Sequence, residues 1–227
     1  QTGAAAVWYG GLTGAGLLGI LRCTGWLLGA GTLRGSRVQT VVLALALLTV
    51  LCSGIAALRE PMLARRLSWV ACGQGAAAVF GAAMAARGAF AGTILTLLFG
   101  GLAEALVFLG ADAFRAKAGK AAVRQLDGIG RQMPLTLFCF AMGALVLAGL
   151  PPLGGFSALW LLAGGALGGS ALEQAGAGVL LAGALCRAGA LIPPVARGFF
   201  PGAAYEPDTR VHRGWCLAIP LVLLTGG

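Results

Sequence analysis

Two long stretches of this sequence, residues 38–58 and 135–171, contain no charged residue at all. Of 227 residues only 16 are Lys or Arg and 7 are Asp or Glu, and the mean hydropathy is +0.90. Soluble domains carry about a quarter charged residues, whereas a helix of roughly 20 apolar residues crosses a bilayer core. The sequence therefore excludes a soluble enzyme, a secreted module and a disordered tail, and it predicts an all-α polytopic transmembrane bundle.

The apolar runs are expected to be helices, because backbone groups in lipid must be paired within their own segment. At about 30 residues for each crossing with its loop, the length fits about six to seven membrane helices in a single integral membrane domain. We expect a processed N-terminus or a longer chain, since residue 1 is Gln and no cleavable signal precedes the first run. The runs cover residues 4–21, 38–58, 67–86, 89–111, 135–150, 155–168, 175–196 and, too short to cross, 214–224.

The sequence Leu-Pro-Pro-Leu-Gly-Gly at residues 150–155 interrupts one of these runs. Two adjacent prolines remove two donors and clash with the preceding turn, so a continuous helix cannot pass through Pro151 and Pro152. The interruption is either a tight turn between two crossings or an unwound point within one crossing. Gly154 and Gly155 belong to the break in both cases.

The distribution of basic residues distinguishes these alternatives, because Lys and Arg collect on the cytoplasmic side. Two separate crossings would place eight basic residues on one side and six on the other, whereas one interrupted helix places eleven against three. We therefore expect residues 151–155 to be non-helical at membrane depth, where transporters place broken helices beside ion pathways. The eleven are Arg59, Arg65, Arg66, Arg115, Lys117, Lys120, Arg124, Arg131, Arg197, Arg210 and Arg213, and the three are Arg34, Arg37 and Arg87.

Four ordered motifs resemble one family of membrane subunits. Residues 56–69, AALREPMLARRLSW, are similar to A-A-L-x-Q-x-D-L-K-R-x-L-A-Y, and residues 100–109, GGLAEALVFL, to H-A-x-x-K-A-L-L-F-L. Residues 126–134, LDGIGRQMP, are similar to L-x-G-L-x-R-x-M-P, and residues 148–157, AGLPPLGGFS, to the start of A-G-L-P-P-x-x-G-F-x-S/A-K. The family comprises the antiporter-like subunits of proton-pumping NADH:quinone oxidoreductase (respiratory complex I), Mrp cation/proton antiporters and energy-converting membrane hydrogenases.

The resemblance implies a fold of inverted repeats, each with one broken helix. On that basis residues 1–31 form the end of a first repeat, residues 38–197 most of the second five-helix repeat, and residues 198–227 a C-terminal loop and a partial helix. It also implies an integral protein of a bacterial or archaeal cytoplasmic membrane. The implied partners are other membrane subunits of the same complex, lipid and a peripheral redox arm.

The departures from the family motifs concern its lysines. Ala64, Glu104 and Leu159 stand where the motifs carry lysine, and Gly100 stands where the second motif carries histidine. Ala and Leu cannot carry a proton, and arginine does not release one. The resemblance thus implies a reduced antiporter-like subunit of a proton-translocating oxidoreductase, mainly a scaffold, with redox cofactors in partner subunits and no catalytic centre or cofactor in this chain. The alternative is an independent cation/proton antiporter or channel subunit.

Three charged residues, Arg22, Glu104 and Arg187, lie within apolar runs. A charge at the bilayer centre costs about 2.5–3.5 kcal/mol on insertion scales, so each needs a partner or water. In the expected topology Glu104 and Arg187 lie at depths that differ by about 4–5 Å. Glu104, Arg187 and Arg65, which follows Ala64, are therefore the candidates for a proton path. The alternative for Glu104 and Arg187, which we favour, is a buried pair that neutralises charge.

Other chemistry is not indicated. The six cysteines are far apart and lack Cys-x-x-Cys spacing, and His212 is the single histidine, so no metal site is expected. The Gly-x-Gly-x-x-Gly pattern at residues 14–19 lacks the strand and acidic residue of a dinucleotide site. We attribute the basic loop at residues 115–131 to topology, or to contact with anionic lipid or an acidic subunit, and expect no nucleic acid partner.

Overall fold

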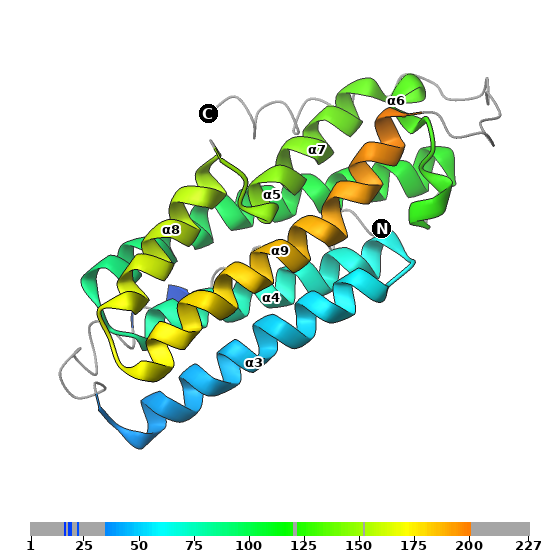
Figure 1. Ribbon diagram of the computed structural model, residues 1–227. Coiled ribbons are helices and arrows are strands. Elements are labelled where there is room, and N and C mark those ends of the chain that lie inside the picture. The colour runs from blue at the N-terminus through cyan, green and yellow to red at the C-terminus, as the bar shows by residue number, and fades with distance from the viewer. Residues whose placement is uncertain are drawn as a thin grey trace.

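The computed structural model describes residues 16, 18, 19, 22, 35–119, 122–151 and 153–200. The expected runs at residues 4–21 and 214–224 lie almost wholly outside the described residues. Where the chain is described it is a bundle of helices (Figure 1), with one isolated bridge between Met62 and Ala122. The helices are α3 (Arg37–Arg59), α4 (Leu63–Ala83), α5 (Arg87–Ala118), the 3-10 turn η2 (Val123–Gln125), α6 (Ile129–Gln132), α7 (Pro134–Ala148), α8 (Gly154–Leu167) and α9 (Ala171–Phe199).

Local sequence explains where the long helices begin and end. The Ser36 hydroxyl accepts the Gln39 backbone N–H at 3.1 Å, which caps the start of α3. Ser170 and Glu173 form a capping box at the start of α9. Gly119 caps the end of α5 and Gly149 caps the end of α7, both with positive φ, a backbone conformation that favours glycine.

Three of these helices are long and apolar enough to cross a membrane, namely α3, α5 and α9. Helix α4 has 21 residues but is less apolar, because Arg65, Arg66 and Gln74 interrupt its run. Helices α7 and α8 have only 15 and 14 residues. Each would measure about 20 Å, short of the roughly 30 Å hydrocarbon core, so they can cross only together.

Helices α7 and α8 follow one another along α5 as a single interrupted helix (Figure 1). Gly143 of α7 packs against Leu106 in the second half of α5, and Leu162 of α8 packs against Gly92 in its first half. A tight hairpin would instead pack α7 face to face against α8. The expected interrupted helix is therefore confirmed, and the hairpin alternative is wrong.

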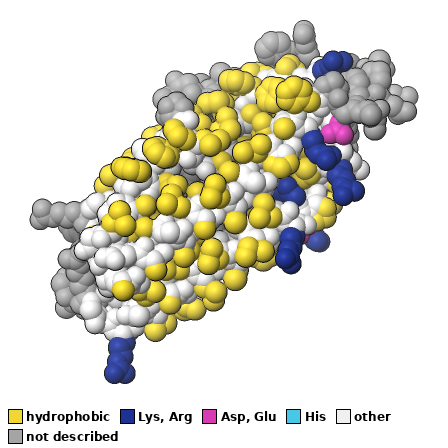
Figure 2. Space-filling model, in the orientation of Figure 1, with side chains coloured by type: hydrophobic (Ala, Val, Ile, Leu, Met, Phe, Trp, Pro, Cys, Tyr) yellow, Lys and Arg dark blue, Asp and Glu magenta, His cyan; other side chains and the backbone are white. Residues whose placement is uncertain are grey.

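The basic residues of the expected cytoplasmic side gather at one end of the bundle. The backbone N–H of Gly128 donates to the Arg197 carbonyl at 3.0 Å, and Arg197 forms an ion pair with Asp127 at 3.8 Å, so the end of α9 lies beside the loop before α6. Most Lys and Arg side chains on the face in Figure 2 gather at this end of the bundle. Arg34, Lys120, Arg210 and Arg213 lie outside the described residues.

The helix break begins and ends earlier than the sequence predicts. Helix α7 ends at Ala148, and helix resumes at Gly154 instead of near Phe156. Gly154 and Gly155 are therefore not unwound but lie in the first turn of α8, a correction to the predicted break at residues 151–155. Their role is close packing: a Cβ at Gly154 would lie 2.7 Å from the Phe99 ring, and one at Gly155 would collide with the Val146 carbonyl. Pro151 lies in the break, and Pro152 is outside the described residues.

The break lies between two apolar clusters in the core. The cluster at the basic end includes Phe114, Ile129 and Phe140, and the cluster at the opposite end includes Leu43 and Phe80. Leu147, just before the break, packs in the first cluster, and Leu162, after the break, packs in the second. The interruption thus separates the interior of the bundle into two apolar halves.

Candidate functional site

A small cavity lies at the helix break, with a volume of about 10 Å³. Four long elements contribute to its wall: α4, α5, the broken helix α7–α8, and α9. The lining residues are Gln74, Ala77, Thr96, Val146, Leu147, Gly149, Gly155, Leu159, Leu162 and Arg187. The wall is apolar except for three side chains, those of Gln74, Thr96 and Arg187.

Arg187 reaches the break from the middle of α9. Its side chain is only 5% exposed, and its Nε atom has no hydrogen-bond partner. A buried Nε–H group without an acceptor is costly, because this donor has lost water and gained nothing in return. Leu159, which the sequence places at the last lysine position of the family motif, lines the same cavity. The cavity at the break is therefore lined by the permanently charged guanidinium of Arg187 and by the apolar side chain of Leu159.

Glu104 is buried on α5 at 9% exposure but does not line the cavity. Its charge interacts with that of Arg187, as the common depth predicted. No direct ion pair joins the two described side chains. The structure therefore places Glu104 and Arg187 near enough for their charges to interact but not in an ion pair, and their roles stay predictions.

Sequence reasoning missed Gln74 and Thr96 as site residues. The Gln74 side chain lies against Gly100, where an added Cβ would be 2.9 Å from the Gln74 Nε2 atom. Gly100 is the position at which the family motif carries histidine, so the absence of a side chain there leaves room for the Gln74 amide. The Thr96 hydroxyl donates to the Gly92 carbonyl at 2.8 Å. Polar residues within apolar runs were the only available signal.

The remaining sequence candidates lie away from the cavity. Arg65 is exposed in the first turn of α4, and Arg22 is helical and exposed. Arg66, the residue after Arg65, is buried and donates to three backbone carbonyls: Glu60 at 2.8 Å, Ala190 at 3.0 Å and Leu58 at 3.4 Å. Arg66 therefore ties the end of α3 to α9, a structural role that the sequence did not indicate.

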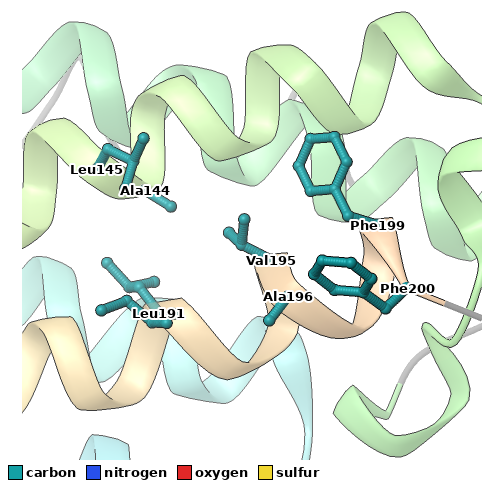
Figure 3. Close-up of a pocket in the computed structure, with 8 residues that line it drawn as sticks. Ala144, Leu145, Leu191, Val195, Ala196, Phe199 and Phe200 are labelled. Carbon is teal, nitrogen blue, oxygen red and sulfur yellow. The ribbon is translucent and has the colours of Figure 1, made fainter. Parts of the chain in front are cut away.

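A larger groove of about 510 Å³ lies between α7 and α9 toward the basic end (Figure 3). Its lining is entirely apolar, with Phe199 and Phe200 at one end. Such a surface offers no group that could hold an ion or move a proton. The groove therefore adds no ionisable side chain to those at the small cavity and to Glu104.

Comparison with known proteins agrees with this architecture. The family described as NADH:quinone oxidoreductase/Mrp antiporter, TM matches residues 7–184. NADH-quinone oxidoreductase subunit N of Desulforudis audaxviator is 31% identical over 162 residues, which is 71% of this chain and 28% of that protein. The chain thus spans less than a third of this relative.

Two solved structures share the fold. A chain of the membrane-bound sulfane sulfur reductase, an archaeal respiratory membrane complex, superposes with a TM-score of 0.81 at 21% identity, covering 96% of this chain and 37% of that one. A chain of the Mrp complex from Dietzia sp. gives a TM-score of 0.73 at 22% identity, covering 84% and 43%.

These matches and the interrupted helix define an integral membrane protein with the antiporter-like fold. The chain belongs to the NADH:quinone oxidoreductase/Mrp antiporter transmembrane family. The family resemblance of the four sequence motifs is thereby confirmed.

Proposed function

We propose that this chain is a reduced antiporter-like subunit of a multi-subunit membrane oxidoreductase, related to complex I or to membrane hydrogenases, and that it serves mainly as a scaffold. Its partners are other membrane subunits, with the redox cofactors bound in those partners and in a peripheral arm. The membrane is the cytoplasmic membrane of a bacterium or archaeon. Residues 38–197 correspond to most of the second repeat of the family fold.

The composition of the helix break supports the scaffold role. The cavity is lined by Leu159 and by the side chains of Gln74, Thr96 and Arg187, none of which exchanges a proton near neutral pH. Among the described residues, the buried charged side chains are Arg66, Glu104, Glu173 and Arg187. Glu173 caps α9 at the end opposite most of the basic residues, so within the described part of the chain Glu104 is the one buried carboxylate near the middle of the bundle. A single carboxylate does not make a relay through the membrane.

Purification of the chain from its native membrane tests membership in a complex. A tagged chain extracted in mild detergent is expected to bring further membrane subunits and subunits whose flavin or iron–sulfur absorption is visible. The Leu159→Ala variant is expected to lower the yield of the complex while leaving the proton-to-electron ratio of reconstituted vesicles unchanged. An altered ratio at normal yield would show that protons pass beside Leu159.

The same preparations distinguish the alternative function. An independent cation/proton antiporter would purify as a stable chain without redox subunits, and vesicles containing that chain alone would acidify when a cation gradient is imposed. Neither result is expected, because the described interior lacks a series of titratable side chains across the bundle.

A further inference from the structure

The apolar groove between α7 and α9 opens toward the outside of the bundle (Figure 3). Two buried residues form its floor, Ala144 of α7 and Leu191 of α9, each 1% exposed. Exposed residues form its rim: Ile192 at 45%, Phe199 at 50% and Phe200 at 73%. Its volume of about 510 Å³ lies within the range of about 300–1,000 Å³ that is typical of pockets for one small molecule. Because the chain is an integral membrane protein, such a groove contacts either lipid or another protein segment.

The length of the groove favours a lipid. Along α9 it extends from Leu191 to Phe199, which is about 12 Å at the helical rise of about 1.5 Å per residue. One leaflet contributes about 15 Å, half of the hydrocarbon core. On α7 the groove ends at Leu145, in the last turn before the break. A transmembrane helix of a partner would continue across both leaflets, whereas this groove stops within one, as an acyl chain does.

The aromatic end of the groove lies at the basic end of the bundle (Figure 2). It is bordered by the last turn of α9 and by α6 with the loop before it, which approach closely: a Cβ at Gly130 would lie 3.0 Å from the Gly198 carbonyl oxygen. The charged residues of these segments are Arg131, Arg197 and Asp127. Arg131 is exposed, and the Arg197 side chain is 45% exposed and forms an ion pair with Asp127 at 3.8 Å. Two cations against one carboxylate leave a net positive charge where lipid phosphates lie.

We propose that this groove is a binding site for one anionic phospholipid. One acyl chain lies along the floor between α7 and α9, and the phosphate interacts with Arg131 and Arg197. A zwitterionic lipid could fill the groove equally well but gains nothing from the net charge. The inference requires only that the chain is embedded in a membrane, so it is independent of the scaffold role and of proton movement.

Site-specific photocrosslinking identifies the occupant directly. The chain, purified with its associated subunits, is reconstituted into vesicles of phosphatidylglycerol and phosphatidylethanolamine in equal amounts and with identical acyl chains. A p-benzoylphenylalanine replaces Ile192 on the rim of the groove or, as the control, Leu185, which is 75% exposed on the same helix outside the groove. Mass spectrometry of the adducts gives the ratio of anionic to zwitterionic lipid. We expect this ratio to be about fivefold higher at position 192, the attraction of one net basic charge for an anionic lipid.

Arginine variants test the phosphate contact. In the double variant Arg131→Gln and Arg197→Gln the ratio at position 192 should fall to that at position 185. Arg59→Gln is the matched control, because Arg59 is an exposed arginine at the end of α3 and does not border the groove. The proposal is wrong if the two positions give equal ratios, or if the double variant changes the ratio no more than Arg59→Gln does. Adducts at position 192 with residues 201–227 or with a neighbouring subunit in place of lipid would also overturn it.

Discussion

Gly155 illustrates how a single residue controls the broken helix. It lies in a regular helical turn, so its conformational freedom is not what the structure uses. A Cβ at this position would collide with the backbone carbonyl of Val146, which a flexible side chain cannot relieve. The close approach of α8 to the end of α7 therefore depends on the absence of a side chain.

We predict that Gly155→Ala destabilises the protein by about 1–3 kcal/mol, the usual cost of overpacking a filled interior. Gly164→Ala is the control, because Gly164 lies on the same helix and has no neighbour within 4 Å of an added Cβ. Thermal unfolding of the purified complex measures the difference. Equal melting temperatures for the two variants would show that the contact between the helix halves is unimportant.

We predict that Glu104 and Arg187 act as a pair of buried opposite charges. Removing one partner of a buried pair typically costs about 3–5 kcal/mol, because the other charge is left uncompensated. We predict that Glu104→Gln and Arg187→Gln each lower the yield of the assembled complex and that the double variant recovers part of it. Yield and vesicle acidification are measured on the same preparations. Normal assembly of Glu104→Gln with reduced acidification would instead assign the carboxylate to proton transfer.

At the scale of elements, α9 contains two prolines, Pro193 and Pro194, within its helical span. Pro194 has no N–H, so the Ala190 carbonyl four residues earlier lacks its helical donor. Arg66 of α4 donates to this carbonyl at 3.0 Å, and the same guanidinium caps the end of α3 through the Leu58 and Glu60 carbonyls. Three helices are thus joined by one side chain.

We predict that Arg66→Met lowers the free energy of unfolding by about 1.5–3 kcal/mol, the range for hydrogen bonds that involve a charged group. Arg65→Gln is the control, because Arg65 is the residue next to Arg66 and its own side chain is exposed. Pro194→Ala restores an N–H to the Ala190 carbonyl, so Arg66→Met should cost less in that background. Detergent-induced unfolding monitored by circular dichroism gives the four values, and strict additivity of the two substitutions would contradict the shared carbonyl.

At the scale of the whole molecule, the distribution of charge predicts the orientation of the bundle. Basic residues gather at the end that contains α6 and the end of α9, and we predict that this end faces the cytoplasm. The turn between α8 and α9 then lies on the opposite side. The break between α7 and α8 lies between these two surfaces, at membrane depth.

Single cysteines in a background without the six native cysteines test this arrangement. We predict that Ala116→Cys reacts with a membrane-impermeant maleimide only in inside-out vesicles and Gly168→Cys only in right-side-out vesicles, because both positions are exposed at opposite ends. Leu153→Cys, within the break, should react slowly from both sides. Rapid reaction of Leu153→Cys from outside would show that the break is a hairpin turn at the membrane surface and not an interruption at membrane depth.

The sequence by itself determined the class of the protein, the approximate bounds of its helices and the interruption at Pro151, and it predicts the orientation of the chain. These follow from hydropathy, the two adjacent prolines and the count of basic residues, which are local properties that act against the bilayer one segment at a time. It also placed Glu104 and Arg187 at a common depth, because the rise along a helix is fixed.

Only the tertiary structure decided which polar side chains meet. Gln74, Thr96 and Arg187 come from three different helices, and they share a cavity because each helix has a particular rotation about its own axis. The link from Arg66 to the Ala190 carbonyl joins residues 124 positions apart. Such rotations are set by the packing of small residues against large ones across helix faces, as at Gly92 and Leu162, and this packing depends on all helices at once.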